Sequence, residues 1–152
     1  MAARIQPVFE KFLIPAPATR ETSPRLNINV VFTSVDATLA ALKEAGRLAN
    51  NLAAHITLVV VQIVPYPLPL TSPAVSVEWN KRRFRVIANK SPVETTIHLY
   101  LCRDRFETLV SVLRPGSVIV IGGRKRWWPT KEKALAKTLR RAGHEVIFTG
   151  TE

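Results

Sequence analysis

The chain has 152 residues, enough for one domain with a sizeable hydrophobic core and too few for two independent domains of common size. An apolar fraction of 47% and a charged fraction of 22% exclude a globally disordered chain. The formal net charge of +11 favours polyanionic partners such as nucleic acid, anionic lipid or phosphorylated small molecules, with a solvated basic surface as the open alternative.

The cysteine content and the hydropathy exclude two further classes of protein. Cys102 is the only cysteine, so it cannot form an internal disulfide, and no histidine stands at metal-ligand spacing from it. No apolar run reaches the roughly 18–20 residues of a membrane span, and the N-terminus lacks the pattern of a signal peptide. We therefore expect a cytoplasmic protein without a membrane span, or the corresponding part of a larger one.

Residues 1–25 are predicted to be an arm rather than a core element, and residues 26–152 to be the globular domain. The arm contains four prolines, which remove backbone donors and disfavour helix. Its segment 9–14 holds four apolar residues, too many for a freely solvated tail. We therefore expect the arm to pack on its own domain or on a partner subunit.

The next segment is predicted to be a β-α-β unit. It begins with a strand over residues 27–32 and continues with a helix for which Asp36 is a suitable N-cap. Apolar residues at helical spacing follow as far as about Asn51. Residues 56–64 are a nearly continuous β-branched run, as expected of a parallel strand covered on both faces.

The middle of the chain is less regular. Four prolines between residues 65 and 73 predict an extended loop. Residues 75–90 favour a helix rich in Lys and Arg, although the apolar pattern at its start also fits a strand. A strand over residues 95–102 follows, and then a helix that begins at a capping-box pattern, Asp104 with Glu107.

The last segment is predicted to be β-α-β. It has a strand over residues 117–121, a helix over residues 130–142 and a final strand over residues 145–149. Gly143 is suited to the left-handed position that ends the helix. Because strands alternate with helices throughout, the fold class is α/β, a single-domain open parallel sheet with helices on both faces.

The turn after the fourth predicted strand is the best candidate for a ligand site. Gly122 and Gly123 would let backbone amides approach an anion, and Arg124, Lys125 and the helix start at Thr130 add positive potential. Such a turn lies at the carboxyl end of a strand, where open α/β sheets bind ligands. The alternative is a tight loop with exposed arginines, since no complete phosphate-binding glycine motif is present.

A carboxylate follows the first strand in the corresponding position. If strands one and four are neighbours, Asp36, with Ser34 before it, faces the same crevice as Gly122. The carboxylate of Asp36 could then accept a hydrogen bond from an adenine amino group or a ribose hydroxyl. The alternative is that Asp36 serves only as an N-cap.

The remaining unusual residues favour structural roles. Trp127 and Trp128 could stack on bases, but a loop or interface anchor fits the short, proline-limited segment better. Cys102, beside Arg103 at a helix start, could have a lowered pKa, but an unreactive thiol is favoured. No nucleophile, acid-base or metal motif is present, so we expect a protein that is not an enzyme.

The order of elements, with Val35-Asp36 after the first strand, Pro65 after the second and the apolar run 117–121 leading to Gly122, resembles the universal stress protein family. The resemblance implies a five-stranded parallel sheet of order 3-2-1-4-5 and a dimer. It also implies, as in one branch of the family, ATP bound between the ends of strands one and four. Asp36 matches the adenine-side aspartate, and Gly122 matches the first glycine of the phosphate motif G-x2-G-x9-G-[S/T].

The rest of that phosphate motif is absent from the chain. Lys125, Leu135 and Ala136 stand where the motif has its second glycine, third glycine and hydroxyl residue. The sequence therefore predicts a stress-response or signalling domain that lacks the usual ATP site. Its cofactor stays unknown: ATP, another nucleotide or another phosphorylated small molecule at the crevice after strands one and four.

We expect this domain to be a homodimer. An alternative of a different class is a basic module that binds nucleic acid or an acidic surface through its two Lys/Arg-rich segments, residues 81–90 and 124–141, and its tryptophans.

Overall fold

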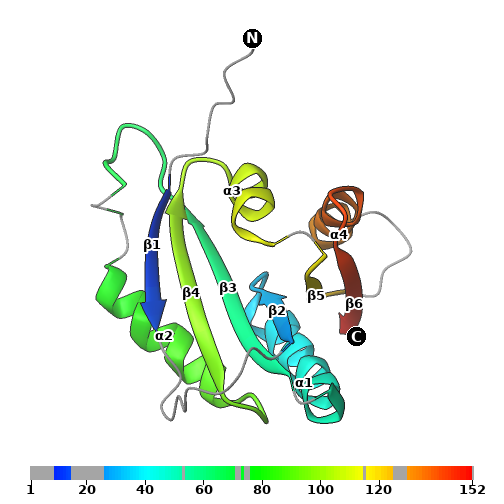
Figure 1. Ribbon diagram of the computed structural model, residues 1–152. Helices are drawn as coiled ribbons and strands as arrows, with labels where there is room; N and C mark the ends of the chain where they lie inside the picture. Colours follow the sequence, from blue (N-terminus) through cyan, green and yellow to red (C-terminus); the bar gives the residue numbers. More distant parts are fainter. Residues whose placement is uncertain are drawn as a thin grey trace.

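The structure is a computed structural model that describes residues 9–14, 26–52, 54–70, 73, 76–114, 116–124 and 130–151. Its centre is a six-stranded sheet of order β1-β4-β3-β2-β5-β6 (Figure 1). The strands are β1 Phe9–Ile14, β2 Asn27–Val31, β3 His55–Ile63, β4 Thr95–Cys102, β5 Val118–Arg124 and β6 Glu145–Thr151. Strands β2 to β6 pair in parallel, whereas β1 is antiparallel to β4.

The prediction of an open, largely parallel α/β sheet is confirmed, and its strand number and overall order are corrected. The sheet has six strands, because β1 is added at the β4 edge. Numbered among themselves, the five parallel strands follow the order 3-2-1-4-5. The whole sheet therefore differs from the predicted one by its antiparallel edge strand.

Strand β1 comes from the segment that the sequence predicted to be an arm. Phe12 and Ile14 pack against the core on one face of the sheet. On the other face, the Phe9 ring meets the Tyr100 ring edge-on, with their centroids 5.5 Å apart. Apolar burial on both faces therefore explains why this short segment joins the sheet.

Four helices cover the two faces of the sheet: α1 Val35–Leu52, α2 Val77–Asn89, α3 Arg105–Val112 and α4 Lys131–Arg141. Helices α1 and α2 share one hydrophobic core with the sheet, and α3 and α4 share another on the opposite face (Figure 1). No helix in the described ranges combines the length and the hydrophobicity needed to cross a lipid bilayer.

Local sequence explains how helices α1, α3 and α4 are capped, and the predicted cap of α1 is corrected. Asp104 caps α3 by accepting from the Glu107 amide at 2.9 Å, and Gly143 takes the left-handed conformation after α4, with φ of 95°, as predicted. Helix α1, however, begins after Ser34, whose hydroxyl accepts from the Ala37 amide at 3.3 Å. Asp36 lies exposed in the first helical turn, because the helix starts two residues earlier than a cap at Asp36 requires.

Candidate functional site

Gly122 and Gly123 lie inside strand β5 rather than in a turn after it. They pair in register with Thr149 and Gly150 of β6. A Cβ atom at Gly122 would lie 2.6 Å from the carbonyl carbon of Ala37 and even closer to the carbonyl oxygen of Ala37. The glycine is therefore required by the close packing of α1 on β5, a structural reason that does not involve an anion.

Several of the predicted site residues do gather around this end of β5. The Thr33 hydroxyl donates to the Gly122 carbonyl at 3.0 Å, which joins the end of β2 to β5. Ser34 and Asp36 belong to the start of α1, which packs on Gly122. The first turn of α1 and the end of β5 are therefore neighbours.

The other predicted site residues lie around Gly123. Thr130 caps α4 by accepting from the Lys133 amide at 3.2 Å. Glu132, in the first turn of that helix, lies close beside Gly123. Arg124 is exposed at the end of β5, and Lys125 lies outside the described residues, as do Trp127 and Trp128.

A cleft of about 380 Å³ lies next to this group, on the side of β3 and α2. Such a volume falls within the range of small-molecule sites. The cleft combines aromatic, cationic, amide and aliphatic side chains. Its lining residues are Phe32, Trp79 and Phe84; Arg83 and Arg105; Gln62 and Asn80; and Val60, Val61 and Ile63.

Arg83 lies among the aromatic side chains of the cleft. Its guanidinium carbon is 5.9, 5.7 and 5.5 Å from the ring centroids of Phe32, Trp79 and Phe84. Phe32 and Phe84 meet edge-on at 5.0 Å and form an apolar wall. Within the described residues Arg83 has no carboxylate partner. Its guanidinium group makes only weak cation-π contacts with these rings.

Arg105 brings a second cation to the cleft from the first turn of α3. One of its terminal nitrogens donates to the Phe32 carbonyl at 3.2 Å. Its Nε atom is buried and has no hydrogen-bond partner among the described residues. An unsatisfied buried donor costs about 1–3 kcal/mol, so the described part of the chain leaves this Nε uncompensated.

Two amide side chains complete the polar part of the lining. Asn80 is buried on α2 and donates through its side-chain nitrogen to the Gln62 side-chain oxygen on β3. This hydrogen bond ties α2 to the carboxyl end of β3. The cleft as a whole suits a ligand with a flat ring and an anionic group, because aromatic rings and two cations without a carboxylate partner in the described residues line the same space.

Solved structures with this architecture decide the fold. A universal stress protein family member from Burkholderia pseudomallei superposes with a TM-score of 0.56 and 20% identity, over 82% of this chain and 96% of that one. Universal stress protein UspA from Lactobacillus plantarum gives a TM-score of 0.51 and 19% identity, over 84% and 99% of the two chains. The chain has the universal stress protein fold.

A third structure with the universal stress protein fold is a universal stress protein in complex with cAMP. It superposes with a TM-score of 0.53 and 16% identity, over 86% of this chain and 100% of that one. No protein-family model matches the sequence. No curated protein matches it either. At identities of 16–20%, these superpositions show the fold alone, and the ligand has to be inferred from the residues of this chain.

Two of the positions that the sequence matched to the phosphate motif are core residues in the structure. Leu135 and Ala136 are 2% and 1% exposed and pack in the core under α4. Their side chains therefore have no access to a phosphate. This burial gives a structural reason for the departure from the ATP motif that the sequence showed.

Cys102 lies in the core, and the described residues form no metal-type cluster. The Cys102 thiol is fully buried, and burial raises its pKa, which favours the unreactive thiol. Within the described ranges, no three His, Cys, Asp or Glu side chains converge as a metal site requires.

Sequence reasoning missed the cleft for a physical reason. Its lining comes from four separate segments, the end of β2, the end of β3, α2 and the start of α3, and nothing local marks them as partners. Trp79 and Arg83 stand one helical turn apart, and this spacing was the sequence signal that places both side chains on one face of α2. Arg83 was assigned only to a general basic cluster, and Arg105 only to a helix start.

Proposed function

We propose that this universal-stress-protein-like domain binds a nucleotide or a closely related phosphorylated ligand in the cleft between β3, α2 and α3, and that it does not transform the ligand. The observation that carries the proposal is the pair Arg83 and Arg105. Both guanidinium groups reach an aromatic cleft without a carboxylate partner in the described part of the chain, and one buried Nε lacks an acceptor.

The ligand has a ring and an anionic group in this proposal. Its ring packs against Phe32 and Trp79, while its phosphate accepts from Arg105 and lies near Arg83. The cAMP complex of a protein with the same fold supports a nucleotide as the ligand class. Phe32 also adjoins Thr33, which bonds to Gly122, so the cleft borders the crevice that the sequence predicted.

The proposal favours a nucleoside monophosphate over ATP. Leu135 and Ala136, which stand at two positions of the triphosphate motif, are buried in the core, so their side chains offer no group to additional phosphates. Two guanidinium groups suffice for one phosphate. We therefore expect AMP or cAMP to bind more tightly than ATP.

Isothermal titration of the full chain with AMP, cAMP and ATP tests this function. Arg105→Met and Arg83→Met should each weaken binding about 10-fold or more, because a hydrogen bond to a charged group contributes about 1.5–3 kcal/mol. Arg82→Met is the matched control, since Arg82 is an exposed neighbour on α2 that does not line the cleft. No heat with any nucleotide, or equal weakening in all three variants, would remove the proposal.

The absence of catalysis is part of the same proposal. Incubation of the protein with ATP should release no ADP or phosphate above a buffer control, and steady turnover would contradict this part. The homodimer and the cytoplasmic location stay predictions from the sequence.

A further inference from the structure

We propose that the outward face of α4 binds the phosphate backbone of nucleic acid, at a site separate from the nucleotide cleft. Helix α4 buries Leu135, Ala136 and Leu139 against the sheet. Its exposed positions are Lys131, Ala134, Lys137, Arg140 and Arg141. The face that points away from the sheet therefore carries cations and a single alanine.

The acidic residue of α4 does not neutralise this face. Glu132 lies beside Gly123, on the side of the sheet. Among the residues that the structure describes, the ion pairs are Arg47 with Glu44 and Lys81 with Glu78, on α1 and α2. The cations at 137 and 141 stand one turn apart, about 6 Å along the helix axis, without a carboxylate partner in the described structure.

Helix stability does not account for this charge pattern. Arg140 and Arg141 in the last turn complement the helix dipole, but Lys131 in the first turn opposes it. Lys137 and Arg141 are a like-charge pair at i and i+4, which disfavours the helix. Arg140 also donates to the Val146 carbonyl at 3.0 Å, so it has a structural role that Lys137 and Arg141 lack.

The composition of the face selects nucleic acid among polyanionic partners. A helix that binds a membrane surface inserts apolar side chains, and α4 directs its leucines into its own core. Protein interfaces are enriched in aromatic residues and depleted of lysine at their centres. A face dominated by Lys and Arg suits the phosphate backbone of nucleic acid.

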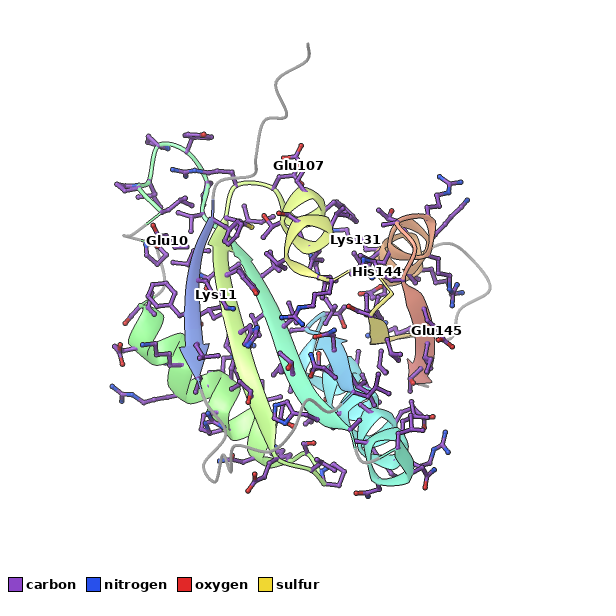
Figure 2. All side chains as sticks on the ribbon, viewed as in Figure 1. Glu10, Lys11, Glu107, Lys131, His144 and Glu145 are labelled. Atoms are coloured by element: carbon purple, nitrogen blue, oxygen red, sulfur yellow. The ribbon has the colours of Figure 1, made fainter. Side chains whose placement is uncertain are left out.

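The α4 face and the cleft lie in different parts of the molecule. Helix α4 contacts β5 and β6, whereas α2 packs on β4 (Figure 1). Figure 2 shows long nitrogen-tipped side chains that extend from α4 away from the sheet. The two proposed sites can therefore be tested independently.

The test is fluorescence anisotropy of the full-length protein with a labelled 20-nucleotide single-stranded RNA, measured at several salt concentrations. The double substitution Lys137→Gln with Arg141→Gln should weaken binding at least 10-fold in 100 mM salt. It should also reduce the slope of log K against log salt by about 1.4, since each phosphate contact contributes about 0.7 for a single strand. Glutamine keeps helix propensity, and an unchanged thermal midpoint verifies folding.

The charge-matched control is the double substitution Lys43→Gln with Arg82→Gln, at exposed positions on α1 and α2. It removes the same net charge and should change the affinity less than twofold. Equal weakening by both double variants would show that net charge alone attracts the RNA and would overturn the α4 site. Absence of RNA binding, or tighter binding to vesicles that contain anionic lipid, would overturn it as well. Retained AMP binding in the α4 variant separates this outcome from failure of the nucleotide cleft.

Discussion

Gly122 lies at the close contact between strand β5 and helix α1. The sequence predicted a glycine turn that exposes backbone amides to an anion. In the structure the residue is part of β5, and the absent Cβ leaves room for the Ala37 carbonyl group of α1. Sequence alone could not separate the two roles, because both require a glycine at the end of a strand.

Substitutions at the two adjacent glycines test this packing. Gly122→Ala should lower the free energy of unfolding by about 2–4 kcal/mol, because its Cβ overlaps backbone that cannot move independently. Gly123→Ala should cost less, since its Cβ meets the Phe148 ring tip and the Glu132 side chain, which can shift. Urea unfolding measures both. A neutral Gly122→Ala, or a larger effect at Gly123, would contradict the close contact between α1 and β5.

His98 gives the fold a dependence on pH. Its pKa is lowered from 6.5 to about 4, first by burial and then by the charges of Lys11 and His55. The pKa of His98 is lower in the folded protein than in the unfolded chain. The contribution of neutral His98 to the free energy of unfolding is therefore present above pH 6.5 and is lost as the pH falls toward 4. The free energy of unfolding should therefore be about 1–2 kcal/mol lower at pH 5 than at pH 7.

The substitution His98→Gln checks the source of this loss. The variant should lose clearly less stability between pH 7 and pH 5 than the parent protein does. A smaller loss should remain, because burial also lowers the pKa of His144 and acts with the same sign. An unchanged difference between the two pH values in His98→Gln would rule out His98 as the main group.

At the scale of elements, local sequence predicted the strands β2 to β6 and all four helices. These elements combine regular apolar periodicity with caps such as Asp104 and Gly143, so local and tertiary preferences agree. Strand β1 was missed because prolines surround a six-residue segment whose pairing with β4 is distant in sequence. The cap of α1 was misplaced because Ser34 and Asp36 are both good N-caps two residues apart.

The edge strand offers a matched pair of substitutions. Phe12 packs against the core shared with α1 and α2, whereas Leu13 is 56% exposed on the opposite face. Phe12→Ser should lower the free energy of unfolding by about 1–3 kcal/mol, and Leu13→Ser by less than about 0.5 kcal/mol. Denaturant midpoints measure the difference. Equal effects would show that β1 contributes little to the core.

At the scale of the whole molecule, the three-layer arrangement leaves a cleft at the carboxyl end of β3. The sequence predicted a ligand at that end from the general behaviour of open parallel sheets. It could not predict the cleft beside β3, which α2 and the start of α3 help to line. That cleft depends on side-chain packing between segments far apart in the chain.

In the proposed complex, Arg105 and Arg83 bind the phosphate of a nucleotide in the cleft. The most direct measurement is a nuclear magnetic resonance titration of ¹⁵N-labelled protein with AMP, observed at the arginine Nε–H groups. The signals of Arg105 and Arg83 should shift with saturation, while that of Arg47, which is paired with Glu44, stays in place. An unmoved Arg105 signal, or shifts confined to Arg140 and Arg141 of α4, would contradict the account.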